Sequence, residues 1–156
     1  MADERAGTGL ETAATPDRRG LDAFGGLVPT GAFARAGETV VCALVVEHHA
    51  DGAAVPLLGL SSAPGVLGID PESDVRAADD RGRAYDVRTV TRDAGLGAVQ
   101  ATLWLTPGPP ADARRLELTV ERLTRTSVGR RGGVERPLAD GPWRLTIESL
   151  PGRTAV

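Results

Sequence analysis

Apolar and polar residues alternate with period two in several short stretches of this chain. The clearest are residues 116–121 (LELTVE) and 143–148 (WRLTIE). Because successive side chains of a β-strand point to opposite faces, each stretch would place one face against a core and the other toward water. No stretch has apolar residues at i, i+3, i+4 and i+7, the spacing of an amphipathic helix. The pattern therefore predicts an all-β, antiparallel protein.

Turn residues divide the chain into eight predicted strands. We expect them at about residues 26–34, 39–49, 55–60, 74–78, 84–90, 97–106, 114–124 and 142–150. The second strand is apolar on both faces through Val46, which favours a central position covered on both sides. Asp51-Gly52 predicts a tight hairpin after it. The Gly-rich segment 125–140 is expected to be a mobile loop.

Seven or eight short strands at this spacing are typical of a β-sandwich or a barrel. We expect one domain over residues 23–150, preceded by a tail (1–22) with almost no bulky apolar residues, which is predicted to be disordered. Residues 151–156 form a short C-terminal tail. The expected core consists of large apolar strand residues: Val41, Leu44, Val46, Leu58, Leu103, Leu105, Leu116, Leu118, Val120, Trp143, Leu145 and Ile147.

Composition narrows the classes of partner. A net charge of −3 and an aromatic content of 3% argue against a nucleic-acid binder, which needs basic charge and stacking platforms. The first residues have no basic start followed by an apolar segment, and no apolar run is long enough to span a membrane. We therefore expect a soluble, cytoplasmic protein. All 18 basic residues are Arg and Asn is absent, which suggests a high-GC bacterial genome.

Three segments resemble, in order, the motifs of a family of Ig-like domains from high-GC bacteria. Residues 79–85 (DDRGRAY) are similar to its DD-x-G-x-x-Y turn, and residues 106–118 (TPGPPADARRLEL) to its P-x-P-P-x-A-x-x-L-x-L step. Residues 140–147 (DGPWRLTI) resemble its closing G-x-W strand. The resemblance covers about residues 26–150 and implies an Ig-like β-sandwich of seven to eight strands, with no catalytic residues. We expect Trp143 to cap one end of the core, its indole N–H finding a partner.

We do not expect the histidines to form a metal site. His48 and His49 are adjacent, so within a strand they would point to opposite faces and could not bind one ion. A copper site of the cupredoxin kind needs two His, a Cys and usually a Met. Met1 is the only methionine, and Cys42, in an apolar run, is expected to be a buried small hydrophobe. We expect both imidazoles at the solvent end of their strand.

The acidic segment 70–74 (DPESD) superficially resembles a calcium loop. An EF-hand loop requires Gly at its sixth position and Glu at its twelfth, where this chain has Val75 and Arg81. A solvated loop is the expectation, and an irregular calcium site is the alternative. Its ligands would be Asp70, Glu72, Asp79 and Asp80.

Two further motifs carry weak signals. Residues 59–63 (GLSSA) fall one residue short of the G-x-S-x-G elbow of hydrolases, which also needs a strand-to-helix turn and a His base. Residues 125–136 contain four arginines against one glutamate, a local charge of +3, which suits either an anionic partner or a solvated hairpin.

These observations predict a non-catalytic interaction or structural module that needs no cofactor and no metal. A protein partner would bind through an exposed edge strand or the 125–140 loop, because edge strands can accept a strand from another chain. The alternative is a small-ligand or calcium-binding domain that uses the acidic segment 70–80. The oligomeric state stays open.

Overall fold

The computed structural model describes residues 24–129, 132–138 and 140–148, the first six of them by backbone alone. These residues form thirteen strands, all paired antiparallel, and one helix of a single turn. The all-β, antiparallel prediction is confirmed. None of the described residues belongs to a helix that is long and apolar enough to cross a bilayer. The predicted tails, 1–22 and 151–156, lie outside the described residues.

The elements follow one another as β1 (Phe24–Pro29), β2 (Phe33–Ala36), β3 (Thr39–Ala43), β4 (Val45–His49), β5 (Ala53–Ser61), β6 (Val66–Gly68), α2 (Pro71–Asp74), β7 (Val75–Asp79), β8 (Ala84–Leu96), β9 (Ala98–Thr106), β10 (Arg115–Val120), β11 (Thr124–Thr126), β12 (Glu135–Pro137) and β13 (Trp143–Glu148).

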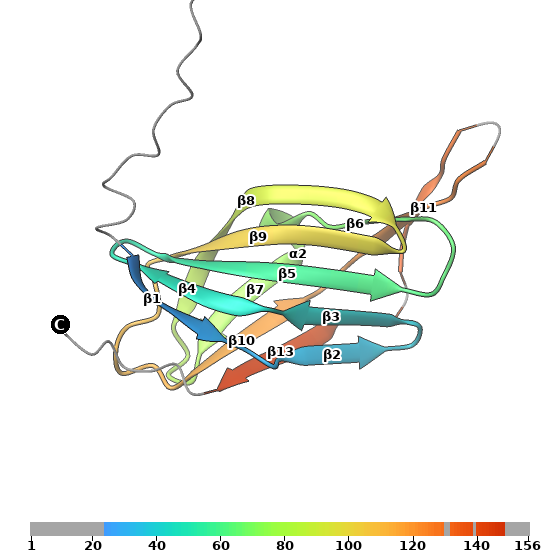
Figure 1. Ribbon diagram of the computed structural model, residues 1–156. Coiled ribbons are helices and arrows are strands. Elements are labelled where there is room, and N and C mark those ends of the chain that lie inside the picture. The colour runs from blue at the N-terminus through green and yellow to red at the C-terminus, as the bar shows by residue number, and fades with distance from the viewer. Residues whose placement is uncertain (1–23, 130–131, 139, 149–156) are drawn as a thin grey trace, which may run out of the picture.

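The strands form one sheet that curls back on itself (Figure 1). Its main path runs β1-β4-β5-β9-β8-β6-β11-β12, and β2 joins it through β3, which pairs with β5. β13, β10 and β7 pair in that order and lie behind this path. β8 connects the two parts because its first residues, Ala84 and Tyr85, pair with β7, while residues 86–95 pair with β9. The two parts enclose the core, and an Ig-like relationship stays a prediction.

The two predicted strands 26–34 and 39–49 are each divided in two. Ala43 pairs with Leu57 of β5, whereas Glu47 pairs with Ala54, so the register shifts by one residue around Leu44. This extra residue separates β3 from β4, which then pair with β2 and β1 respectively. The central position is confirmed, but cover on both faces is not, because Leu44 is 51% exposed.

The core lies between the two parts of the curled sheet. Ten of the twelve expected core residues are buried, including Trp143, whose indole N–H donates to the Thr39 carbonyl at 3.2 Å as predicted. The core predictions for Leu44 and Leu58 are wrong, since the first is exposed and the second is half-buried. Along β5 the inward positions are those of Val55 and Leu57, because strand parity places Leu58 on the other face.

The loop prediction for 125–140 is wrong. Residues 124–126 and 135–137 form a hairpin, β11–β12, and β11 also pairs with β6. The connection 61–73 likewise contains β6 and leads into α2. Three-residue strands carry too little period-two signal to be distinguished from loops in the sequence.

Candidate functional site

The turn after β7 is organised around one buried carboxylate. Asp79 Oδ1 accepts hydrogen bonds from the backbone N–H groups of Arg81 and Arg83, at 2.9 and 3.0 Å. Its Oδ2 accepts from the Tyr85 hydroxyl at 2.7 Å and from Arg83 Nε at 2.6 Å. Gly82 completes the turn with a φ of +76°, a conformation that side chains disfavour. The DD-x-G-x-x-Y segment is thus a structural clamp.

Hydrogen bonding controls the protonation of this clamp. Burial alone would raise the pKa of the Asp79 carboxyl, but the hydrogen bonds from Tyr85, Arg83 and Arg81 outweigh burial and hold that pKa well below its usual range. Burial, followed by the adjacent Asp79 carboxylate, raises the pKa of Tyr85 well above its usual value. The pair therefore holds an ionised acid beside a neutral phenol, which stabilises the turn.

The four acids considered for calcium have separate roles. Asp79 is committed to the clamp, and Asp80 accepts from the backbone N–H groups at the start of β10. Glu72 accepts from the Thr89 N–H at 3.3 Å, and Asp70 accepts from the Ser73 hydroxyl at 3.1 Å. Nowhere in the described part of the chain do three His, Cys, Asp or Glu side chains gather as ligands for a metal ion.

The histidines point to opposite faces of β4, as predicted. His48 is 7% exposed and lies on the core side, so its expected position at the solvent end is wrong. His49 lies on the other face, with its ring 5.2 Å from that of Trp104 and its Nε2 3.8 Å from Glu47. Cys42 also lies on that outer face and is half-buried, where a core position was expected.

The serine of the incomplete elbow serves the strand that contains it. Ser61, at the end of β5, accepts hydrogen bonds at its hydroxyl oxygen from the Thr39 hydroxyl at 3.0 Å and from the Ala63 N–H at 3.2 Å. These contacts join β5 to β3, and no strand-to-helix elbow is present there.

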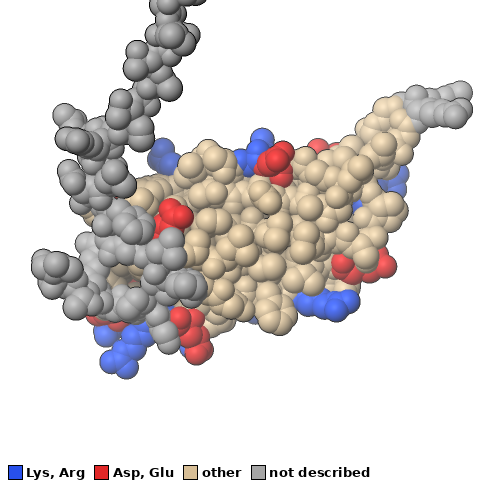
Figure 2. Space-filling view, in the orientation of Figure 1, with Lys and Arg blue, Asp and Glu red and all other residues tan. Residues whose placement is uncertain are grey.

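Across four strands, the outer face of the sheet carries one charged side chain, that of Arg35 at the β2 edge. It consists of outward side chains of β2, β3, β5 and β9 and of the residue after β3, and we call it the outer face: Phe33, Arg35, Val40, Cys42, Leu44, Pro56, Leu58, Leu60, Ala98, Gln100, Thr102 and Trp104. Its centre carries no charge in Figure 2, where the charged side chains lie at the rim. Phe33, Leu44 and Leu60 are 69%, 51% and 44% exposed.

A pocket lies on the other side of β8, beside α2, the helical turn that follows β6 and precedes β7 in the chain. It has a volume of about 500 Å³, and Asp70, Asp74, Arg92, Arg122, Thr124 and Glu135 are among its lining residues. We call it the Arg92 pocket. Arg122 Nη2 lies 3.1 Å from Asp74 Oδ1, and the Asp74 side chain is only 7% exposed. Arg92 Nη1 donates to the Ile69 carbonyl at 3.3 Å.

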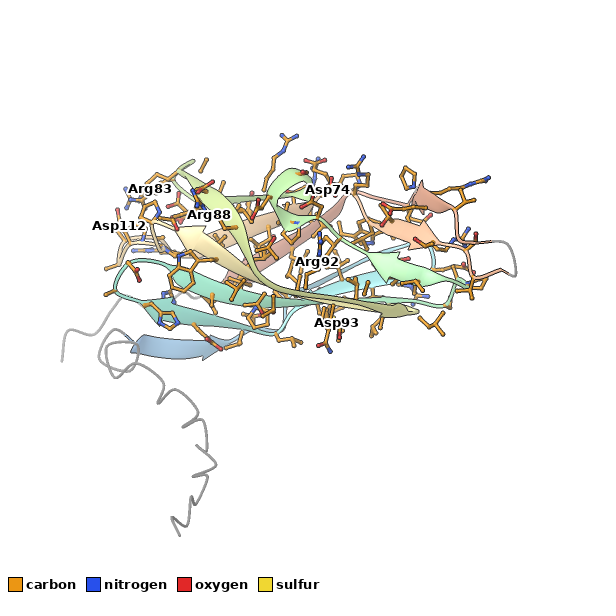
Figure 3. All side chains as sticks on the ribbon, turned by 90° about the horizontal axis from the view of Figure 1, so that it is seen from above. Asp74, Arg83, Arg88, Arg92, Asp93 and Asp112 are labelled. Atoms are coloured by element: carbon orange, nitrogen blue, oxygen red, sulfur yellow. The ribbon has the colours of Figure 1, made fainter. Side chains whose placement is uncertain are left out.

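A β-bulge aims Arg92 into this pocket. Thr89 pairs with Leu103 of β9, but Thr91 pairs with the next residue, Thr102, so Val90 is an extra residue in β8. The insertion exchanges the two faces of the strand beyond it. Arg92, opposite the buried Ala101, therefore points inward, and Asp93 points outward (Figure 3).

Sequence reasoning missed this pocket, although it considered two of its acids, Asp70 and Asp74, as part of a calcium loop. The missing signal was the bulge, because uninterrupted alternation would direct Arg92 toward solvent. Comparison of the chain with protein-family models, with curated proteins and with solved structures gave no match. The outer face and the Arg92 pocket are therefore the two features from which a function can be inferred.

Proposed function

We propose that this protein is a non-catalytic interaction module that assembles through its outer face, and that the partner is a second copy of the same chain. The observation that carries this proposal is the outer face, whose only charged residue is Arg35 at the β2 edge and on which three large apolar side chains are between 44% and 69% exposed. Contiguous exposed apolar surface on a folded protein usually marks an interaction site.

The size of the face suits a weak dimer. β2 and β3 have four and five residues, and β5 and β9 have nine each; at a spacing of about 4.8 Å the four strands cover about 440 Å². Two such faces together would bury about 900 Å², the size of a weak or transient interface. We expect a dimer that dissociates on dilution.

Charge at the rim favours a second copy in one orientation. Arg35 lies on β2 at one edge of the face, and Asp93 lies on β8 at the other. Phe33 and Asp93 lie in the same row of cross-strand partners, which crosses β3, β5 and β9 between them. Arg35 lies two residues beyond Phe33 on β2. A twofold axis parallel to the strands would place Arg35 of each copy near Asp93 of the other. An axis perpendicular to the strands would place the β2 edges together, with like charges adjacent.

The test is the mass of the protein by sedimentation velocity over a wide range of concentration. The wild-type chain should dimerise reversibly, and Leu60→Glu and Leu44→Glu should each shift the equilibrium to monomer. Val134→Glu is the matched control, since Val134 is 55% exposed but lies beside the β11–β12 hairpin.

The orientation has its own test in a charge exchange. Arg35→Asp and Asp93→Arg should each weaken the dimer, and the double variant should restore it. A wild-type chain that stays monomeric up to millimolar concentration would sink the proposal. If Val134→Glu weakened the dimer as much as Leu60→Glu and Leu44→Glu, the interface would lie at the hairpin instead. If the double variant did not restore the dimer, a twofold axis parallel to the strands would be rejected.

A further inference from the structure

The Arg92 pocket has the features of a ligand site that is separate from the outer face. We propose that it binds a small molecule carrying one carboxylate and at least one cationic group, as in a basic amino acid. Its volume of about 500 Å³ lies within the usual range for small-molecule sites, and charged side chains of both signs line it.

The cation in the pocket lies on the inward side of β8 and is still exposed there. Arg92 follows the Val90 bulge and lies on the inward face of β8, opposite Ala101, which is 3% exposed. Bulges are frequent next to active sites, where they change the direction in which a side chain points. The bulge therefore places a guanidinium at the wall of the pocket.

This guanidinium retains most of its hydrogen-bonding capacity. A guanidinium has five N–H donors, and in Arg92 one of them donates to the Ile69 carbonyl. Within the described residues, no carboxylate oxygen lies within 4.0 Å of it as an ion-pair partner. A planar guanidinium with donors to spare is the preferred protein partner for a ligand carboxylate, which it can bind with two parallel hydrogen bonds.

The remaining charges of the pocket select the rest of the ligand. Arg122 and the buried Asp74 neutralise each other at 3.1 Å. Asp70 and Glu135 also line the pocket, and no ion pair joins either of them to a described arginine. Once Arg92 has bound a carboxylate, these two acids are complementary to ammonium or guanidinium groups. The same acids disfavour a phosphate, whose second negative charge they would repel.

The experiment is calorimetric titration of the full chain with L-lysine as the probe. Hexanoate supplies the carboxylate without the cations, the methyl ester of lysine supplies the cations without the carboxylate, and inorganic phosphate tests the rival anion. L-Lysine should bind at least about tenfold more tightly than each of the other three, a ratio that corresponds to one charge-assisted contact.

A matched pair of variants locates the site. Arg92→Gln should weaken L-lysine binding at least about tenfold. Arg88→Gln removes the same charge from the outward face of the same strand, where Arg88 pairs with Asp86 at 3.0 Å, and it should leave binding unchanged (Figure 3). Glu135→Gln changes an exposed residue and should weaken L-lysine binding while leaving hexanoate binding as it was.

Three results would overturn the proposal. They are no heat of binding for L-lysine in the wild-type chain, tighter binding of phosphate than of L-lysine, or equal losses for Arg92→Gln and Arg88→Gln. Urea unfolding shows whether each variant is folded. If Arg92→Gln does not fold, the effect of Glu135→Gln on L-lysine binding still tests the proposal. These outcomes can be told apart from a failure of dimer formation, because Arg92 and Glu135 line the pocket and neither lies on the outer face.

Discussion

Replacement of Asp79 by Asn should destabilise the protein in a pH-dependent way. Asparagine keeps one oxygen for the backbone N–H groups of Arg81 and Arg83, but it puts an NH₂ group where Oδ2 accepts from Tyr85 and Arg83. Each charge-assisted hydrogen bond contributes about 1.5–3 kcal/mol, and Arg83 is 40% exposed, so its share is at the lower end. We expect Asp79→Asn to lower the free energy of unfolding at pH 7 by about 3 kcal/mol.

The pH dependence follows from the lowered pKa of Asp79 in the folded state. A group of this kind stabilises the fold above its unfolded pKa, and the stabilisation is lost as the pH falls through the range between the unfolded and folded values. With an unfolded pKa of about 3.9, the wild-type chain should lose about 1 kcal/mol from this group between pH 7 and pH 3. Asparagine does not titrate, so the deficit of Asp79→Asn should shrink to about 2 kcal/mol at pH 3.

Urea unfolding followed by tryptophan fluorescence at pH 7 and pH 3 measures both quantities. Asp86→Asn is the control, because Asp86 is a 62%-exposed carboxylate on β8 paired with Arg88, and its loss should cost less than about 0.5 kcal/mol at either pH. A deficit for Asp79→Asn that is constant between the two pH values, or that matches the control, would refute the reasoning.

Two further substitutions test the packing. Trp143→Phe should lower the free energy of unfolding by about 1–3 kcal/mol in urea titrations, because it leaves the buried Thr39 carbonyl without its indole donor; an effect near zero would contradict this role. Gly52→Ala should lower the free energy of unfolding by about 1–3 kcal/mol, because the added Cβ would lie 2.5 Å from the Trp104 ring. Gly129→Ala is the control in the same assay: its Cβ would meet nothing within 4 Å, so the free energy of unfolding should change by less than about 0.5 kcal/mol.

The alternation of apolar and polar residues predicted the inward side chains best where a strand is regular. β10 and β13 alternate without interruption, and their inward residues, among them Leu118 and Leu145, are buried as expected. The assignments failed at the shift around Leu44 and in β5, where both faces are apolar and the sequence pattern cannot distinguish Leu57 from Leu58. A one-residue register shift reverses inward and outward, and residue types alone do not reveal it.

The candidate sites were harder to predict than the core because they depend on contacts between distant segments. The sequence shows Asp70 and Asp74 as neighbours in an acidic run, but not that the link after β10 brings Arg122 to Asp74. Likewise, the apolar run around Cys42 was interpreted as doubly covered, since the pattern cannot show that the outward side stays open.

One inserted residue connects the two proposed surfaces. Because Val90 is bulged out of the β8–β9 ladder, Arg92 faces the pocket and Asp93 faces the rim of the outer face; with unbroken alternation each would lie on the other side. If Asp93 pointed inward, it would add a third acid to Asp70 and Glu135, and the pocket would lack the guanidinium that binds a ligand carboxylate. If Arg92 pointed outward, it would repel Arg35 of a second copy. The bulge therefore places both charges where the two interactions require them.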